Sequence, residues 1–343
     1  MKILIQTEGS SQLGHGHIMR SFYLAQAARS RGLDVYFQAL NQYTAEILYG
    51  LGETTVLQSL ANNFDTPIVI IDTPRTIPVS IVRKLHARSA FVLMIDVLTE
   101  ARMEADMVCD AMMTQQRAKK LQHSNKTKYL YGLKYACLDE QFRQYHAMPI
   151  QTNRDRPKLL VAFGGGDMLH SNIKFLTALS KLGFRGPAEI IIGRESNNND
   201  ELHSIIAEWL DSKIVCGARD MARRMADADL VVTKLGLTQL EAFCVGRDCV
   251  VIEPTQAHLD LQQALQEEYN NWPVCECGLA VDDDTFDIAA RETIDRLLNQ
   301  KQRIEKGRLA CQLVDGKGAE RIIEALLQGL SDRVNSKKGN NDG

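Results

Sequence analysis

The stretch that decides the fold is Lys158-Leu-Leu-Val-Ala-Phe-Gly-Gly-Gly166. Its aliphatic run is typical of a strand covered on both faces, and the three glycines allow a tight turn directly after it. A helical pattern over 171–182 follows. The chain opens in the same way, because a strand predicted over 2–6 leads through Gly9 into a helix predicted over 17–31. The sequence therefore contains two starting units of strand, glycine loop and helix.

Each starting unit extends into an alternation of strands and helices that predicts a parallel sheet. Between the two alternations, Leu138–Pro157 is polar and contains Pro149, and we interpret it as a linker. Further aliphatic runs predict strands over 34–40, 67–72, 90–96, 129–131, 188–193, 213–216, 229–233 and 248–253, and helical patterns cover 221–227 and 237–245. The predicted fold class is therefore α/β, with two doubly wound Rossmann-like domains facing each other across a cleft. In such sheets, ligands bind at the carboxyl ends of the strands.

The break in the alternation also sets the predicted domain boundaries. We assign residues 1–145 to an N-terminal domain, 146–157 to the linker and 158–330 to a C-terminal domain. Residues 331–343 are polar and end in glycine, so we expect a disordered polar tail there. The length of 343 residues suits two domains of roughly 150 residues each.

Composition excludes several classes of protein. Hydrophobic residues make up 45% and charged residues 24% of the chain, which excludes a chain disordered throughout. The formal net charge of −3 argues against a nucleic-acid binder, which normally carries a basic excess. No apolar run approaches the ~20 residues that span a bilayer, and the first apolar stretch, Ile3–Ile5, is too short for a signal peptide. We therefore expect a cytoplasmic protein without stable membrane insertion and, since no heptad pattern or apolar stripe stands out, a monomer.

The cysteines give no sign of a metal site. Most of the eight lie in apolar surroundings, as reduced thiols do. Cys275 and Cys277 form a C-x-C pair, but no second pair stands at the spacing of a zinc site. We expect neither a metal nor a cofactor.

The first glycine loop carries the candidate catalytic residue. It runs from Gly9 to Arg20 as Gly-Ser-Ser-Gln-Leu-Gly-His-Gly-His-Ile-Met-Arg. Gly14 and Gly16 allow close approach of the backbone to a ligand, and the N–H groups at the start of the following helix suit a phosphate. His17 falls in the first turn of that helix, where a neutral imidazole can act as a general base. The alternative is that the histidine caps the helix or packs on the sheet.

Two further loops are candidates for binding a phosphate or a sugar. Gly164-Gly-Gly-Asp167 follows the first strand of the second unit, and the alternative is a tight turn without a ligand. Farther on, Gly236 precedes a helix that carries Thr238 and Glu241. Thr238 can cap the helix or bind a phosphate, and Glu241 can accept both hydroxyls of a ribose. The alternative for Glu241 is a capping box with Thr238, three residues before it, and the pattern leaves both open.

These motifs together resemble one known family. Gly14-x-Gly-His-x-x-Arg20 is similar to the opening of the UDP-sugar hydrolases of pseudaminic acid biosynthesis, which remove UDP from UDP-2,4-diacetamido-2,4,6-trideoxy-β-L-altrose. Tyr131–Phe142 resembles the family's G-x-x-Y-A-x-L-x-x-x-F segment, Phe163–Asp167 its G-G-x-D loop, and Gly236–Glu241 its nucleotide-binding G-x-T-x-x-E motif. These hydrolases are related to the spore-coat polysaccharide proteins and the lipid II N-acetylglucosaminyltransferase, so the resemblance implies the two-domain glycosyltransferase-B (GT-B) fold.

The resemblance also implies a role for each matched residue. His17 would be the base that activates water, and Glu241 would hold the uridine ribose. The other implied substrate-binding residues are Gly14, Gly16 and Arg20 in the first motif, Gly165 and Asp167 in the second loop, Met221 beside the uracil, and Gly236, Leu237 and Thr238 at the diphosphate. The N-terminal domain would then hold the sugar and the catalytic base, and the C-terminal domain the nucleotide. Water would attack the anomeric carbon with inversion, and UDP would leave without the help of a metal.

Three stretches depart from the family pattern: Asp72-Thr-Pro-Arg75, Lys234-Leu-Gly236 and Pro254–His258. Arg75 could meet an acidic or acetamido sugar or lie at the surface, and Lys234 could pair with a phosphate or face solvent. Three functions remain open. The first is a UDP-sugar hydrolase, the second a glycosyltransferase of the same fold that replaces water with an acceptor hydroxyl, and the third a nucleotide-sugar-binding protein without catalysis. In each, the partner is a small-molecule UDP-sugar.

Overall fold

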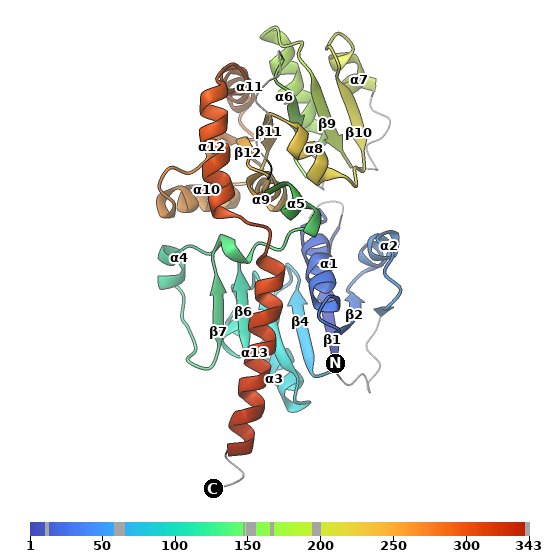
Figure 1. The fold of residues 1–343 in the computed structure, drawn as a ribbon, viewed down its shortest axis with the longest axis vertical. Coiled ribbons are helices and arrows are strands. Elements are labelled where there is room, and N and C mark those ends of the chain that lie inside the picture. The colour runs from blue at the N-terminus through green and yellow to red at the C-terminus, as the bar shows by residue number, and fades with distance from the viewer. Residues whose placement is uncertain are drawn as a thin grey trace. The chain divides into compact units, whose positions relative to one another are not determined.

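The structure is a computed structural model that describes residues 1–10, 14–57, 66–146, 148, 156–164, 168–193 and 200–339. The chain divides into two compact units. The first contains Met1–Ser10, His15–Cys137 and Lys317–Gly343, and the second contains Ser11–Gly14 and Leu138–Gly316. Each unit is built on a parallel sheet with helices on its faces, which confirms the α/β class with two doubly wound sheets (Figure 1). The cleft expected between the sheets stays a prediction.

The first unit has a seven-stranded sheet in the order β3-β2-β1-β4-β5-β6-β7, and every neighbouring pair is parallel. Its strands are β1 (Lys2–Thr7), β2 (Asp34–Ala39), β3 (Val56–Leu57), β4 (Ile68–Asp72), β5 (Phe91–Ile95), β6 (Met107–Asp110) and β7 (Lys128–Tyr131). Its helices are α1 (Gly16–Arg29), α2 (Gln42–Gly50), α3 (Val79–Ala87), α4 (Gln115–Lys119) and α13 (Gly318–Gly339), with the 3-10 turns η1 (Glu100–Met103) and η2 (Leu133–Tyr135).

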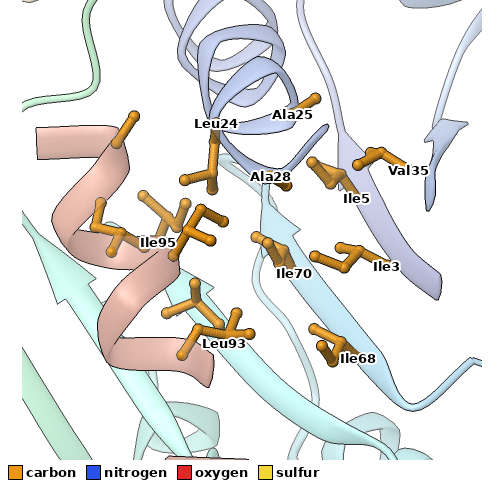
Figure 2. Packing of buried hydrophobic residues seen from close by; sticks show 14 of the residues in the cluster. Ile3, Ile5, Leu24, Ala25, Ala28, Val35, Ile68, Ile70, Leu93 and Ile95 are labelled. Atoms are coloured by element: carbon orange, nitrogen blue, oxygen red, sulfur yellow. The ribbon is translucent and has the colours of Figure 1, made fainter. Parts of the chain in front are cut away.

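Alternate residues of this sheet fill two separate cores. Ile68 and Ile70 of β4 lie on the face covered by α1 and α13, together with Leu24 of α1 (Figure 2). Val69 and Ile71 lie on the opposite face, in the core that includes α3. All of these side chains are almost completely buried, so each contributes ~1.5–3 kcal/mol of hydrophobic stabilisation. A continuous aliphatic run is therefore what a strand in this position requires.

The C-terminal helix α13 packs in the first unit, which differs from the predicted domain boundary at residue 330. Its residues Ala319, Ile322, Ile323 and Leu326 belong to the core that α1 covers. Their spacing marks an amphipathic helix, but the spacing does not reveal which of two sheets the helix covers.

The expected polar tail also differs from the structure, because residues 331–339 continue α13 as a helix. Arg333 helps to hold this last part of the helix against the first unit. Its Nη1 atom donates to the carbonyl oxygen of Ala90 at 2.8 Å and lies 3.3 Å from Oδ1 of Asp106. A polar sequence can form the exposed side of a helix end, so polarity alone does not indicate disorder here.

The second unit has a six-stranded parallel sheet in the order β10-β9-β8-β11-β12-β13. Its strands are β8 (Leu159–Val161), β9 (Ala188–Ile192), β10 (Lys213–Cys216), β11 (Leu230–Thr233), β12 (Asp248–Glu253) and β13 (Val274–Leu279). Its helices are α5 (Glu140–His146), α6 (Leu169–Lys181), α7 (Asp200–Ile206), α8 (Met221–Asp227), α9 (Leu237–Cys244), α10 (Gln256–Glu268), α11 (Asp283–Leu298) and α12 (Gln300–Leu313). Helices α6 and α11 cover one face, where Phe175 and Ala289 are buried against the sheet.

The sequence missed three strands, and it gave ranges only for the helices that correspond to α1, α6, α8 and α9. Strands β3, β6 and β13 are short or rich in polar residues, so their hydrophobic pattern is weak. Helix α5 lies in the polar stretch interpreted as a linker and belongs to the second unit. Its Phe142 is buried, and Nδ1 of His146 donates to the carbonyl oxygen of Cys244 at 2.8 Å.

Candidate active site

Acidic side chains gather at the carboxyl edge of the first sheet. Asp72 ends β4, Asp96 directly follows β5 and Asp110 ends β6, on three neighbouring strands. Asp72 is fully buried and Asp110 nearly so. A buried carboxylate is costly unless hydrogen-bond donors or cations face it, so the groups that meet these side chains define the site.

His17 reaches this edge from the first turn of α1. Its Nδ1 atom lies 2.7 Å from Oδ1 of Asp72. Two acceptors repel each other at that distance, so we assign the proton to Nδ1, which donates it to the carboxylate. Nη2 of Arg20 is also near Nδ1, at 2.9 Å, but it finds its acceptor in Oδ1 of Asp72 at 2.5 Å. The Nε2 atom of His17 keeps its lone pair and makes no hydrogen bond with the described residues.

Arg20 is committed to carboxylates rather than free for a ligand. Its Nε donates to Oδ2 of Asp72 at 2.7 Å, and Nη1 donates to Oδ2 of Asp96. Ser21 adds a further donor to Asp72 at 3.0 Å. Burial by itself would raise the pKa of Asp72, but the charge and hydrogen bonds of Arg20, with the hydrogen bond of His17, lower it to about 2. Asp72 is therefore ionised throughout the neutral pH range.

The arrangement suits a general base. The ionised Asp72 fixes the His17 ring and its tautomer and stabilises the imidazolium that forms when Nε2 takes a proton. The His17 side chain is 23% exposed, so solvent and small molecules can reach it, whereas Asp72 is closed off. Arg20, one helical turn farther along α1, holds Asp72 in place.

Asp110 and Asp72 lie at the same edge of the sheet, but the pKa of Asp110 is raised whereas that of Asp72 is lowered. Its Oδ1 accepts one hydrogen bond, from the backbone N–H of Met112 at 2.9 Å. Burial, and then the negative charge of Asp96, raise the pKa of Asp110 to about 7. At neutral pH the edge therefore carries an ionised carboxylate beside His17 and a second carboxyl that titrates near neutrality.

Arg75, in the stretch that departs from the family pattern, forms an internal ion pair. Its Nε and Nη2 atoms each donate to a different oxygen of Glu8 at 2.5 Å. Glu8 also accepts from Thr73 and Asn41. Through Glu8, Arg75 braces the residue before the first glycine loop, and its own side chain is 55% exposed.

The second unit holds a cradle that suits an anion. We define this phosphate cradle as Gly164, Lys234, Gly236 and Thr238. Gly164 and Gly236 have φ angles of 82° and 148°, which favour glycine. A Cβ atom on Gly164 would lie 3.5 Å from Oγ1 of Thr238 and 3.9 Å from Cε of Lys234, so the two turns and both side chains are close together. No side chain caps α9 at Gly236, which leaves its first N–H groups able to bind a phosphate.

Glu241 follows on the first turns of α9. It is 7% exposed, and its carboxyl group makes no hydrogen bond with the described residues. Burial and the charge of Asp139 raise its pKa to about 8. A capping box would need Thr238 at the N-cap, but the N-cap is Gly236, so the structure does not support that alternative. Two vicinal hydroxyl groups would satisfy such a carboxyl.

Lys234 provides the positive charge of the cradle. A Cβ atom on Gly236 would lie 4.0 Å from its Nζ. Burial lowers the pKa of Lys234, and the negative charge of Glu253 opposes this shift. The pKa of His258 on α10 is likewise lowered, by burial and then by Lys234. Of the two alternatives for Lys234, partial burial beside the glycine turns favours pairing with a phosphate.

The other predicted ligand residues lie at element ends or outside the described residues. Gly14 has a φ of 77° and Gly16 is the first residue of α1. Met221 begins α8 and Leu237 begins α9. The remaining two, Gly165 and Asp167, fall outside the described residues. The roles assigned to all of them stay predictions.

Sequence reasoning missed Asp72 as part of the site, as well as Asp96, Asp110 and Glu253. A signal was present for Asp72, Asp96 and Glu253, because each ends or directly follows a buried aliphatic strand. Asp110 ends β6, whose pattern is too weak to be recognised. In a parallel sheet that position faces the ligand edge. His17 and Asp72 are 55 residues apart along the chain, so their contact cannot be predicted from a local sequence pattern.

Two curated relatives are similar to the chain, although no family model matches it. An uncharacterized protein of Methanocaldococcus jannaschii is 25% identical over 287 residues, which cover 78% of this chain and 58% of that protein. The chain thus spans about three fifths of the length of this relative. The spore coat polysaccharide biosynthesis protein SpsG of Bacillus subtilis is 22% identical over 354 aligned residues, which cover 97% of this chain and 99% of that protein.

Solved structures share the fold at low sequence identity. MurG of Acinetobacter baumannii superposes with a TM-score of 0.65 and 14% identity, covering 96% of this chain and all of MurG. UDP-GlcNAc 2-epimerase from Neisseria meningitidis, bound to UDP-GlcNAc, gives a TM-score of 0.59 and 11% identity over 96% of this chain and 100% of that one. The fold is therefore the two-domain, Rossmann-like α/β fold of GT-B type.

Two features are absent from the described residues, a membrane-spanning helix and a cluster of metal ligands. No helix there has the length and apolar character needed to cross a membrane. Within the same ranges, no three His, Cys, Asp or Glu side chains are placed to hold a metal ion together.

Proposed function

We propose that the chain is an enzyme acting on a UDP-sugar, with the nucleotide in the phosphate cradle of the second unit and the sugar at His17. Specifically, we propose a hydrolase that removes UDP from a UDP-activated diacetamido-trideoxy sugar, in the biosynthesis of a nonulosonic acid such as pseudaminic acid. The observation that carries this proposal is the His17–Asp72 pair, because an anchored imidazole with an open Nε2 suits the activation of water.

The reaction would proceed by a single displacement. Nε2 of His17 takes a proton from water while the water oxygen forms a bond to the anomeric carbon. The bond from that carbon to the phosphate oxygen breaks, and its electron pair leaves with UDP. The configuration at the anomeric carbon is therefore inverted. The leaving diphosphate needs charge stabilisation rather than a proton, and Lys234 with the first N–H groups of α9 can supply it.

The relatives support the nucleotide-sugar class. The epimerase that shares the fold is bound to UDP-GlcNAc, and SpsG is named for polysaccharide biosynthesis. The sequence motif around His17 supports the hydrolase in particular. Glu241 would hold the ribose hydroxyls, and its buried carboxyl, which makes no hydrogen bond with the described residues, suits that role.

A glycosyltransferase is the second candidate. A glycosyltransferase from Rickettsia africae has the same fold, with a TM-score of 0.60 and 10% identity over 96% of this chain and 98% of that one. The same base could activate an acceptor hydroxyl instead of water. A nucleotide-sugar-binding protein without catalysis would keep the cradle but make no use of the base.

Release of UDP separates these candidates. UDP release from the diacetamido-trideoxy sugar nucleotide, in EDTA and without an acceptor, is expected of the hydrolase, with UDP-GlcNAc as the control substrate. Binding of UDP without release, followed by release when an acceptor is added, indicates a transferase. Binding without turnover under either condition indicates a binding protein.

A further inference from the structure

Glu253 holds the backbone turn of the phosphate cradle through a hydrogen bond. It is the last residue of β12 and is completely buried. Its two carboxyl oxygens lie 3.2 and 3.1 Å from the backbone nitrogen of Leu235, which donates to them. This contact fixes the peptide between Lys234 and Gly236, and therefore the turn that exposes the start of α9.

Among the described residues, no positively charged side chain forms an ion pair with Glu253. Lys234 provides a favourable charge, but no ion pair joins the two side chains in the described part of the chain. Glu276 on β13 is a second, unfavourable negative charge, and the charge of Lys234 also acts on His258 of α10. Burial is the largest influence and raises the pKa of Glu253 to about 7. At neutral pH the carboxyl is thus divided between its charged and neutral forms.

We propose that Glu253 is a positioning residue of the phosphate cradle and that a nucleoside diphosphate binds there together with a proton, which this carboxyl takes from solvent. This inference rests on the proposed function, because the ligand is the diphosphate of UDP.

The reason is competition for Lys234. A bound diphosphate places negative charge beside the ammonium group, which then neutralises the phosphate rather than Glu253. Glu253 would be left as a buried carboxylate with a single neutral donor and two negative neighbours. Such a group takes up a proton instead of remaining charged. The neutral acid still accepts the N–H of Leu235 through its carbonyl oxygen, so the turn keeps its shape.

Calorimetry of UDP binding to the full chain measures this proton. Titrations at pH 7.5 in two buffers of different ionisation enthalpy give the number of protons taken up per UDP. A group with a pKa of about 7 is about three-quarters ionised at pH 7.5. Glu253 therefore accounts for an uptake of about 0.5 proton if UDP raises its pKa by one unit, and of up to about 0.75 proton if it becomes fully protonated. We expect the wild-type number to exceed that of Glu253→Gln by an amount in this range. Glu267→Gln, the same change at an exposed position on α10, should match the wild type.

The difference in proton number between the wild type and Glu253→Gln reports on Glu253 alone. Protons taken up by the UDP phosphate and by Glu241 are the same in the wild type and in both variants. If UDP binds and the proton number is the same in the wild type and in Glu253→Gln, the inference is wrong while the proposed function stands. If UDP does not bind the wild type, the proposed function fails, and the inference fails with it.

A second measurement needs no variant, which matters if Glu253→Gln does not fold. In a carboxyl ¹³C NMR titration of the wild type, the Glu253 signal should have its midpoint near pH 7 without UDP. Saturating UDP should raise that midpoint by at least about one pH unit. An unchanged or lower midpoint overturns the inference.

Discussion

Replacement of Asp72 by asparagine tests whether the His17–Asp72 pair is catalytic. Asparagine keeps the shape of the side chain but removes its charge. Its amide can no longer fix the Nδ1–H tautomer of His17 or stabilise the imidazolium. General-base catalysis contributes about 10²–10⁴ in rate, so we expect kcat for UDP release to fall by a factor of that order. The affinity for UDP should change by no more than a few-fold, because the phosphate cradle belongs to the second unit.

The same substitution has a cost in stability that follows from the structure. Folding lowers the pKa of Asp72 from 3.8 to about 2, which corresponds to about 2 kcal/mol of stabilisation. Because the folded pKa is the lower one, this contribution is present above pH 4 or so and is lost as the pH falls through about 2. The variant also leaves the buried Arg20 without its main partner, and breaking a buried pair costs about 3–5 kcal/mol. Urea unfolding at pH 7 should therefore show a loss of about 2–5 kcal/mol.

Asp34→Asn is the matched control. Asp34 starts β2, and its side chain is 69% exposed, with the N-terminal amine 3.8 Å away. Its substitution should leave both turnover and stability within error of the wild type. If Asp72→Asn folds and keeps kcat within about three-fold of the wild type, Asp72 does not serve the base and the reasoning is refuted.

Three further substitutions test the site and the fold. His17→Asn should abolish turnover and leave the Kd for UDP within a few-fold, whereas equal loss of both would make His17 a nucleotide-holding or structural residue. Glu241→Ala should weaken UDP binding at least about ten-fold in calorimetry, since it removes the carboxyl proposed to hold the ribose; an unchanged Kd would exclude that role. Ile323→Ala should destabilise the protein by about 2–5 kcal/mol in urea unfolding, because Ile323 is completely buried between α13 and the first sheet. A loss below about 1 kcal/mol would show that α13 adds little to the first unit.

The sequence predicted most of the fold because buried parallel strands leave a strong pattern. The run Ile68–Ile71 is apolar on both faces, so this strand could be recognised without knowing its neighbours. Strand β13, with Cys275, Glu276 and Gly278, carries no such pattern and was missed. The sequence also could not show which of the two sheets α13 covers, because its apolar face could pack against an uncovered part of either sheet.

Part of the candidate site could be predicted and part could not. His17 and Gly236 belong to short local motifs, which a sequence displays directly. The partners that give His17 its tautomer come from another strand, and no local pattern links them. Asp72 attracted notice only as a departure from the family pattern, although its place at the end of a buried strand is where a parallel sheet presents side chains to a ligand.

The central claim is that His17 activates water to release UDP from a sugar nucleotide. Its most direct test is UDP release from the diacetamido-trideoxy sugar nucleotide, in EDTA and without an acceptor, by the wild type and by His17→Asn. The account predicts steady release by the wild type, at least 100-fold slower release by the variant, and similar UDP affinity for both. Wild-type release no faster than that of His17→Asn would contradict it.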